Sequence, residues 1–140
     1  MSRPAVLCIL LNFRTAEMTL RAAEAALADL HALGGELVIV DNASGDGSYE
    51  VISREVAARG WGEGGLVRVV ASPVNGGFGA GNNIGLRMVM SDGQAPDYYY
   101  ILNSDAFPDA GCTAALLTHL EAHPKAGIAC SHIRGEDNLT

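Results

Sequence analysis

The fold class is decided by the stretch Ala-Val-Leu-Cys-Ile-Leu-Leu at residues 5–11. An apolar run without alternation is typical of a β-strand that is buried on both faces of a sheet. Outward from this run, further β-prone segments alternate with helical patterns, and short polar or Gly-rich breaks separate them. The expected strands are 5–11, 37–40, 66–71, 98–102 and 126–130, and the expected helices are 15–33, 48–59, 81–90 and 108–123. This order predicts an α/β fold with an open, mostly parallel sheet and helices on both faces.

Composition and charge exclude several classes of protein. The chain has 140 residues, about one domain, and with 49% hydrophobic and 18% charged residues it is too apolar to be disordered. We expect one domain over 1–133 and a polar tail over 134–140. Sixteen acidic and nine basic residues give a net charge of −7. Nucleic acids and anionic membrane surfaces bind clustered cations, so neither is an expected partner. No apolar run is long enough to span a bilayer.

Cysteine usage indicates the compartment. Cys8, Cys112 and Cys130 are odd in number, dispersed, and contain no Cys-x-x-Cys pair. The first residues also lack the pattern of a secretory signal. We therefore expect no disulfide scaffold and no zinc ribbon, and a cytoplasmic location.

The first four expected strands each end in a polar or Gly-rich segment. These segments are Asn12-Phe13-Arg14, Asp41-Asn42, Asn75-Gly76-Gly77 and Asn103-Ser104-Asp105. Ligands bind at the carboxyl ends of the strands in open α/β sheets. Four polar exits at one edge therefore predict a ligand site there.

The positions of the glycines argue against two common nucleotide sites. Asp41 stands where dinucleotide-binding folds hold a ribose, but that reading also needs a Gly-rich turn after the first strand. The turn at 11–15 contains no glycine, and the stretch at 75–83 lacks the full G-x-G-x-x-G spacing. A phosphate-binding G-x-x-x-x-G-K-[ST] loop is also absent.

The Gly-rich stretch at 75–83 still requires a physical reason. Glycines allow the backbone to approach a ligand, and N–H groups at the start of a helix attract an anion. Asn75, Asn82 and Asn83 add directed amide groups that a plain linker does not need.

Asp105 is the candidate metal ligand. A carboxylate at a strand end can hold a hard cation such as Mg²⁺ or Mn²⁺, which prefers oxygen ligands. Such an ion would neutralise a diphosphate in a chain that has few cations of its own. By contrast, His119 and His123 are four residues apart on the last expected helix without the Glu of a zinc protease, and are read as a solvated face.

Taken in order, these segments resemble the inverting family 2 glycosyltransferases with the GT-A fold, most closely the rhamnosyltransferase-like branch. The matching stretches are residues 9–13 (ILLNF), 38–48 (VIVDNASGDGS), 75–85 (NGGFGAGNNIG) and 101–105 (ILNSD), and the resemblance covers about residues 5–131. It implies the Rossmann-like nucleotide-binding half of such an enzyme.

The resemblance also implies roles for individual residues. Asn12, Phe13 and Asp41 would hold the base and ribose of a nucleotide-diphospho-sugar. The loop with Asn75, Gly76, Gly77, Asn82 and Asn83 would line the donor site. Residues 102–105 would occupy the place of the Asp-x-Asp motif of the family. Asp105 would then be the ligand of Mg²⁺ or Mn²⁺, and Asn103 replaces the first Asp and would meet a ribose hydroxyl or a metal-bound water.

The resemblance further implies a partner half. Family members continue with an acceptor-binding half that carries the catalytic base, and nothing after Ser131 resembles it. Glu136 and Asp137 are acidic, but they lie in the polar tail. No catalytic residue is therefore assigned, and we expect the chain alone to be inactive or weakly hydrolytic.

The expected partners follow from the same resemblance. They are a dTDP- or UDP-sugar donor, a glycan or lipid-linked acceptor in polysaccharide or cell-wall biosynthesis, and a second copy of the chain. The full enzyme would be cytoplasmic or peripheral at the inner membrane face. Two alternatives stay open: a non-catalytic nucleotide-binding or dimerising module, and a nucleotidyltransferase that makes sugar nucleotides. The second should show a Gly-rich loop with Arg or Lys after the first strand, which is missing.

Overall fold

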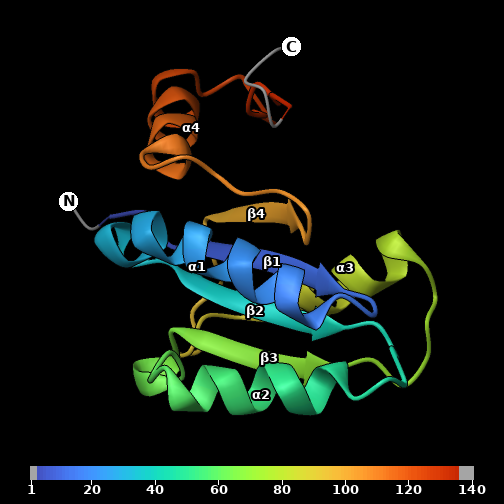
Figure 1. The fold of residues 1–140 in the computed structure, drawn as a ribbon. Coiled ribbons are helices and arrows are strands. Elements are labelled where there is room, and N and C mark those ends of the chain that lie inside the picture. Colours follow the sequence, from blue (N-terminus) through green and yellow to red (C-terminus); the bar gives the residue numbers. More distant parts are fainter. Residues whose placement is uncertain (1–2, 136–140) are drawn as a thin grey trace.

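The aliphatic run near the start of the chain forms the strand β1 (Val6–Asn12; Figure 1). All of the residues of this strand are buried. The computed structural model of the chain describes residues 3–135. After β1 the elements are α1 (Ala16–Leu33), β2 (Glu36–Asp41), α2 (Ser48–Ala58), the short 3₁₀ helix η1 (Glu63–Gly65), β3 (Val67–Ala71), α3 (Phe78–Leu86), β4 (Tyr98–Asn103) and α4 (Cys112–Ala122).

The four strands form one sheet in the order β3-β2-β1-β4, and every pairing is parallel. The register sets Asn12 beside Asp41 and Leu11 beside Asn103, so the carboxyl ends of the strands lie along one edge. The predicted open parallel sheet is confirmed. Its four strands differ from the expected ranges by one residue, at both ends of β1 and β2 and at one end of β3 and β4.

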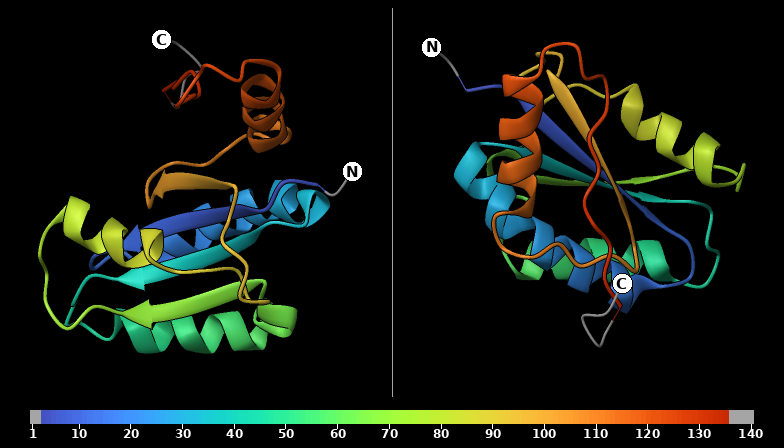
Figure 2. Two further views of the ribbon diagram at one scale, coloured as in Figure 1. Left: turned by 180° about the vertical axis from the view of Figure 1, so that it is seen from behind. Right: turned by 90° about the horizontal axis from the view of Figure 1, so that it is seen from above.

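Helices cover both faces of the sheet, as predicted. α1 and α2 lie on one face and α3 on the other, and α4 lies beyond β4, next to α1 (Figure 2). Alternate residues of β1 divide between two apolar cores because successive side chains of a strand point to opposite faces. The core on the α1 side contains Val6, Cys8 and Leu10, and the core on the α3 side contains Leu7, Ile9 and Leu11.

α3 approaches β1 closely because two of its residues lack a side chain. A Cβ added at Gly85 would lie 2.6 Å from Cγ2 of Ile9, and one added at Gly81 would lie 2.5 Å from Cδ1 of Leu11. Real Cβ atoms do not come so near, so these two glycines are required by packing. The helix starts at Phe78 and ends at Leu86, both earlier than in the expected range 81–90, and it follows Gly77, whose positive φ of 92° favours glycine.

α4 is held against α1 by a carboxylate from the neighbouring helix. Asp29 of α1 accepts hydrogen bonds from the backbone N–H groups of Gly111 (2.8 Å) and Thr113 (3.0 Å). These groups belong to the first turn of α4, where backbone donors have no partner within the helix. The Tyr98 hydroxyl of β4 also donates to Glu121.

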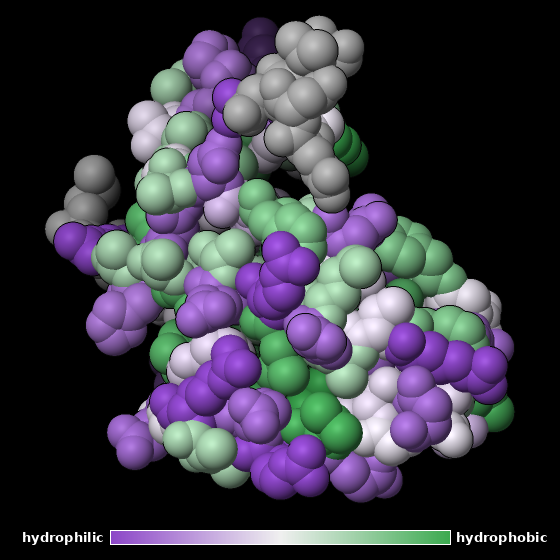
Figure 3. All heavy atoms as spheres, viewed as in Figure 1, coloured by the Kyte–Doolittle hydropathy of each residue, from purple (hydrophilic) through white to green (hydrophobic). Residues whose placement is uncertain are grey.

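The surface on the α1 and α2 side is mixed, with apolar residues interspersed among hydrophilic ones (Figure 3).

Two expectations for the last part of the chain are wrong. α4 begins at Cys112 rather than at Pro108, because a turn precedes it in which the Cys112 N–H donates to the carbonyl of Asp109. Residues 126–130 form no strand. A strand forms only by pairing with the edge of a neighbouring strand. Within residues 3–135 this segment pairs with no strand of the sheet, and Ile128 is left 89% exposed. Most of the expected tail, with Glu136 and Asp137, lies outside the described residues.

Candidate functional site

One open pocket collects residues from all four strand exits. It lies at the carboxyl edge of the sheet and has a volume of about 490 Å³. The residues that line it are Leu11, Phe13, Thr15, Met18, Asn42, Asn75, Gly77, Phe78, Asn103, Ser104 and Asp105. Parallel strands bring their carboxyl ends to the same edge, which is why segments far apart in the sequence meet here.

Five of the residues singled out from the sequence line this pocket. They are Phe13, Asn75, Gly77, Asn103 and Asp105. Of the residues that line it, Asp105 alone carries a charge. Asn103 is exposed at the end of β4, and Asp105 is exposed just after the strand. The pocket therefore offers amide groups, backbone groups and one carboxylate.

Aromatic rings form part of the lining. Phe13 is 42% exposed and Phe78 is 56% exposed, although both are large apolar side chains. The guanidinium of Arg14 lies over the Phe13 ring, 5.0 Å from its centroid. Exposed ring faces such as these can stack on a planar ligand group.

Asn12 and Asp41 are buried beneath the pocket and do not line it. Asn12 is 0% exposed and Asp41 is 4% exposed. The Asn12 amide donates to Oδ1 of Asp41 over 2.8 Å, and the Ser44 hydroxyl donates to the same oxygen over 2.6 Å. The two side chains contact each other because their residues are partners in the β1–β2 register.

The remaining predicted residues, Gly76, Asn82 and Asn83, also lie outside the lining. Gly76 and Asn83 are exposed, whereas Asn82 is 3% exposed within α3. The Asn82 amide donates to the carbonyl of Phe78 over 2.9 Å, so it holds the first turn of α3.

Asn42 lines the pocket, although the sequence analysis named it only as part of a polar strand exit and gave it no role of its own. Its Nδ2 donates to Oδ1 of Asn75 (3.0 Å) and to the carbonyl of Gly77 (3.3 Å). The Gly77 N–H donates to the same Asn75 oxygen, which fixes the direction of both amides. Oδ1 of Asn42 is then left buried without a partner among residues 3–135. The available signal was its place directly after Asp41, where the strand ends.

An unpartnered buried oxygen beside a pocket is informative. Buried polar atoms nearly always have a hydrogen-bond partner, so an exception calls for an explanation. In Asn42 the side chain is 3% exposed and the amide links the exit of β2 to the Gly-rich loop. That oxygen is itself buried, so an N–H or O–H group of a ligand could donate to it only if the Asn42 side chain moved toward the pocket.

The oxygen atoms around Asp105 fit a hard divalent cation that takes most of its ligands from a bound phosphate compound and from water. No three His, Cys, Asp or Glu side chains are grouped to hold a metal ion within residues 3–135. Mg²⁺ is often bound through one or two carboxylates plus substrate phosphates, with water completing the shell. One exposed carboxylate, beside amide and hydroxyl oxygens, matches that arrangement.

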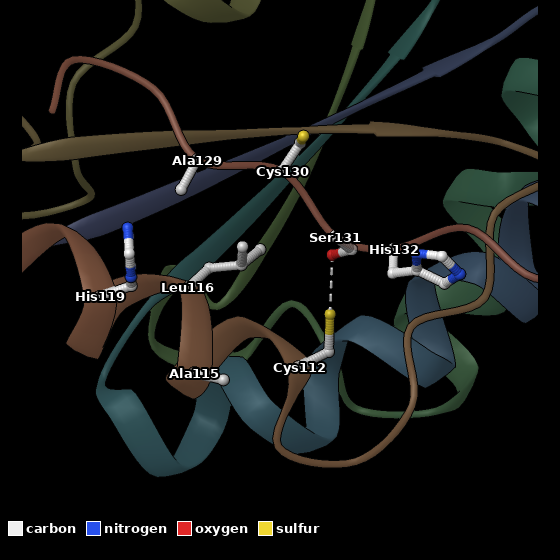
Figure 4. A pocket seen from close by; sticks show the side chains of 8 residues that line it. All are labelled: Cys112, Ala115, Leu116, His119, Ala129, Cys130, Ser131 and His132. Carbon is white, nitrogen blue, oxygen red and sulfur yellow. Dashed lines mark hydrogen bonds between the residues drawn. The ribbon is translucent and has the colours of Figure 1, made fainter.

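A second pocket, of about 420 Å³, lies between α4 and the irregular segment at 129–132 (Figure 4). Its lining includes Cys112, Cys130, His119 and His132. The Cys112 thiol contacts the Ser131 hydroxyl at 3.0 Å, while the Cys130 side chain points away from Cys112 (Figure 4). The thiols and imidazoles are thus not brought together, and the cysteines are free.

The sequence profile of Glycosyl transferase family 2 matches residues 8–140, nearly the whole chain. The chain belongs to glycosyl transferase family 2. This confirms the family inferred from the four motifs, although the match does not distinguish a rhamnosyltransferase-like branch. No curated protein sequence matches the chain.

Solved structures show the same fold as this family 2 chain. The mannosyltransferase PcManGT from Pyrobaculum calidifontis, in complex with GDP-Man and Mn²⁺, superposes with a TM-score of 0.76 over 92% of the chain at 22% identity. S. aureus TarS 1–349 superposes with a TM-score of 0.65 over 91% of the chain at 14% identity, and its complex with UDP-GlcNAc with a TM-score of 0.67 over 91% at 14% identity. The fold is therefore GT-A-like.

The family 2 chain spans little more than a third of each of these structures: 36% of PcManGT, 38% of TarS and 37% of TarS with UDP-GlcNAc. At these identities the likeness establishes the fold and not the ligand. Among residues 3–135, no helix has the length and apolar character to cross a bilayer.

Proposed function

We propose that the chain is the donor-binding part of an inverting glycosyltransferase, and that the pocket at the strand ends binds a nucleotide-diphospho-sugar. The observation that carries the proposal is the meeting of all four strand exits in one pocket, with Asp105 as its one charged lining residue. Membership of family 2 supports it, as do the nucleotide sugars named in the complexes of PcManGT and TarS.

The pocket divides into two parts by chemistry. The exits of β1 and β2 bring the Phe13 ring, which suits stacking on a base, and the Asn42 side chain. The buried Asn42 oxygen would accept from a base N–H group or a ribose hydroxyl after a small movement of that side chain. The exit of β4 brings Asn103 and Asp105, which suit the diphosphate end. Gly77, at the start of α3, adds backbone to the same pocket.

Mg²⁺ or Mn²⁺ would be held by Asp105, with the donor diphosphate supplying further oxygens. The bound ion supplies charge neutralisation of the diphosphate leaving group. Asp105 orients the ion, and Asn103 can donate to a hydroxyl or phosphate oxygen beside it. Among residues 3–135, the lining of the pocket includes no Lys, Arg or His that could neutralise the diphosphate in place of an ion.

Transfer also requires a base for the acceptor hydroxyl. The lining of the pocket contains one carboxylate, Asp105, which is committed to the metal in this proposal. We therefore propose that the base and the acceptor surface come from polypeptide other than residues 3–135, in a longer enzyme. The rhamnosyltransferase-like specificity, a dTDP- or UDP-linked donor, a glycan or lipid-linked acceptor and a cytoplasmic location remain part of this proposal.

Calorimetric titration with dTDP, UDP and GDP, each with and without Mn²⁺, tests the proposal. At least one nucleotide should bind, and Mn²⁺ should tighten its binding. Asp105→Ala should remove the tightening by Mn²⁺. Asp92→Ala, which removes the same charge in an exposed turn outside the lining, should leave it intact. Equally tight binding in excess chelator would contradict the metal assignment, and absence of binding by all three nucleotides would contradict the function.

A further inference from the structure

Beneath the pocket, a continuous chain of hydrogen bonds joins α1 to the exits of β1 and β2. Its members are Thr19, Asn12, Asp41 and Ser44, which we call the buried polar chain. They are 0%, 0%, 4% and 1% exposed, respectively. None of them lines the pocket. In the sequence, however, Asn12 is next to Phe13 and Ser44 is two residues from Asn42, and Phe13 and Asn42 both line the pocket.

Asn12 has no hydrogen-bonding capacity left for a ligand. Its Nδ2 donates to Asp41 Oδ1 (2.8 Å) and to Ser44 Oγ (3.3 Å). Its Oδ1 accepts from the Thr19 hydroxyl (2.7 Å) and from the Thr15 hydroxyl (3.3 Å). A primary amide has two N–H donors and one oxygen with two lone pairs. A ligand could therefore reach Asn12 only by displacing one of these bonds.

Ser44 is saturated in the same way. Its hydroxyl donates to Asp41 Oδ1 (2.6 Å) and accepts from the Arg14 N–H (2.9 Å) as well as from Asn12. The Ser44 carbonyl accepts from Nε of Arg14 (2.9 Å). Ser44 thus ties the loop after β2 to the loop after β1.

The backbone beside this tie is strained. Arg14 (φ 56°) and Ala43 (φ 55°) both have left-handed conformations, which cost free energy in residues other than glycine. Such conformations persist where the surrounding contacts hold them, and the bonds from Arg14 to Ser44 do so here. They also set the Arg14 side chain over the Phe13 ring.

We propose that Thr19 and Ser44 are positioning residues for the nucleotide. Through Asn12 and Asp41 they fix two adjacent loops, so that the Phe13 ring and the Asn42 residue are held at the pocket before a ligand arrives. Asn12 and Asp41 then act on the nucleotide indirectly, in contrast to the direct contact that the resemblance implied. This inference rests on the proposed function, since it assumes that the pocket binds a nucleotide.

Thr19→Val tests the far end of the buried polar chain. Valine keeps the shape of threonine but removes the 2.7 Å bond to Asn12, whereas Thr19→Ser retains a hydroxyl. Dissociation constants are measured for UDP, dTDP and GDP with Mn²⁺, and for pyrophosphate with Mn²⁺ as a probe without a base. Thr19→Val should raise the dissociation constant about 5- to 30-fold for each nucleotide that the unaltered chain binds. The constant for pyrophosphate should not change, and Thr19→Ser should restore nucleotide binding.

Ser44→Ala provides a second test that does not depend on Thr19. It should weaken nucleotide binding in the same way and speed hydrogen exchange at the Arg14 amide, whose acceptor is lost. Ser53→Ala is the matched control, because the Ser53 hydroxyl is buried on α2 and has no partner within the part of the chain that the structure describes. It should change neither quantity.

The outcomes separate the two proposals. If the unaltered chain binds none of the three nucleotides, the proposed function fails and this inference with it. If the unaltered chain binds a nucleotide but Thr19→Val and Ser44→Ala bind it equally well, the positioning role alone is refuted. Equal losses for nucleotide and pyrophosphate also refute it, because a general loss of structure would affect both ligands.

Discussion

Replacing Gly85 by alanine should destabilise the protein, although alanine is the better helix former. The new Cβ would lie 2.6, 2.8 and 2.9 Å from Cγ2, Cγ1 and Cδ1 of Ile9, which is fully buried in β1. Carbon atoms pack at about 3.5–4.0 Å, so α3 and β1 must separate by roughly 1 Å. Such overpacking costs about 1–3 kcal/mol, and the gain in helix propensity offsets about 1 kcal/mol. We expect a net loss of up to about 2 kcal/mol in the free energy of unfolding.

Urea unfolding followed by circular dichroism measures this loss. Gly79→Ala is the matched control on the same helix, since a Cβ there meets no atom within 4 Å, and it should be neutral or stabilising. Ile9→Ala removes all three opposing atoms, so Gly85→Ala should cost nothing further in that background. An equal loss in both backgrounds would refute the argument, because the cost could not then arise from contact with Ile9.

Three further predictions concern other parts of the chain. Asp29→Ala should reduce the free energy of unfolding by about 1 kcal/mol and speed amide exchange in the first turn of α4, which loses two backbone hydrogen bonds; unchanged exchange there would contradict the capping role. The hydrogen bond from the Ser48 hydroxyl lowers the pKa of Asp46 below its ordinary value of 3.8. The ionised Asp46 carboxylate therefore stabilises the fold above pH 3.8, and this stabilisation is lost as the pH falls through the lowered pKa. In that acidic range the urea midpoint should depend less on pH in Asp46→Asn than in the unaltered chain. Burial raises the pKa of the Cys8 thiol, whereas Cys130 is exposed, so iodoacetamide should label Cys130 first and Cys8 only after unfolding, as read by mass spectrometry.

The sheet could be predicted from the sequence because its strands carry their own signal. The aliphatic run of β1 is apolar at every position, and short breaks separate it from the helical patterns on either side. Residues 126–130 have the same apolar character but form no strand. A strand forms only with a partner edge, and composition does not reveal whether that edge is present. The Gly-rich stretch at 75–83 was likewise interpreted as ligand-facing, although its Gly81, like Gly85 beyond it, is required by close packing on β1.

The location of the pocket could also be predicted, but not the direction of each side chain. Polar residues at four strand ends identified the edge of the sheet that carries the pocket. Within β1, however, Asn12 follows Leu10 on the face covered by α1, and the register directs Asp41 to the same side. Asn42, one residue later, reaches the pocket instead. Only the pairing of the strands shows which residue of an adjacent pair meets a ligand.

The strand order also bears on how the protein is made. β1 pairs with β2 on one side and with β4 on the other, and the bond from Ala5 to Asp97 beside the β4 pairing joins residues 92 positions apart. The β2 pairing can form soon after the two strands leave the ribosome. The other edge of β1 must wait until β4 is translated, which at about 5–20 residues per second takes roughly 5–20 s. During that interval a strand that is apolar at every position except Asn12 has an open edge, so a nascent chain stalled before residue 98 is the form most in need of a chaperone.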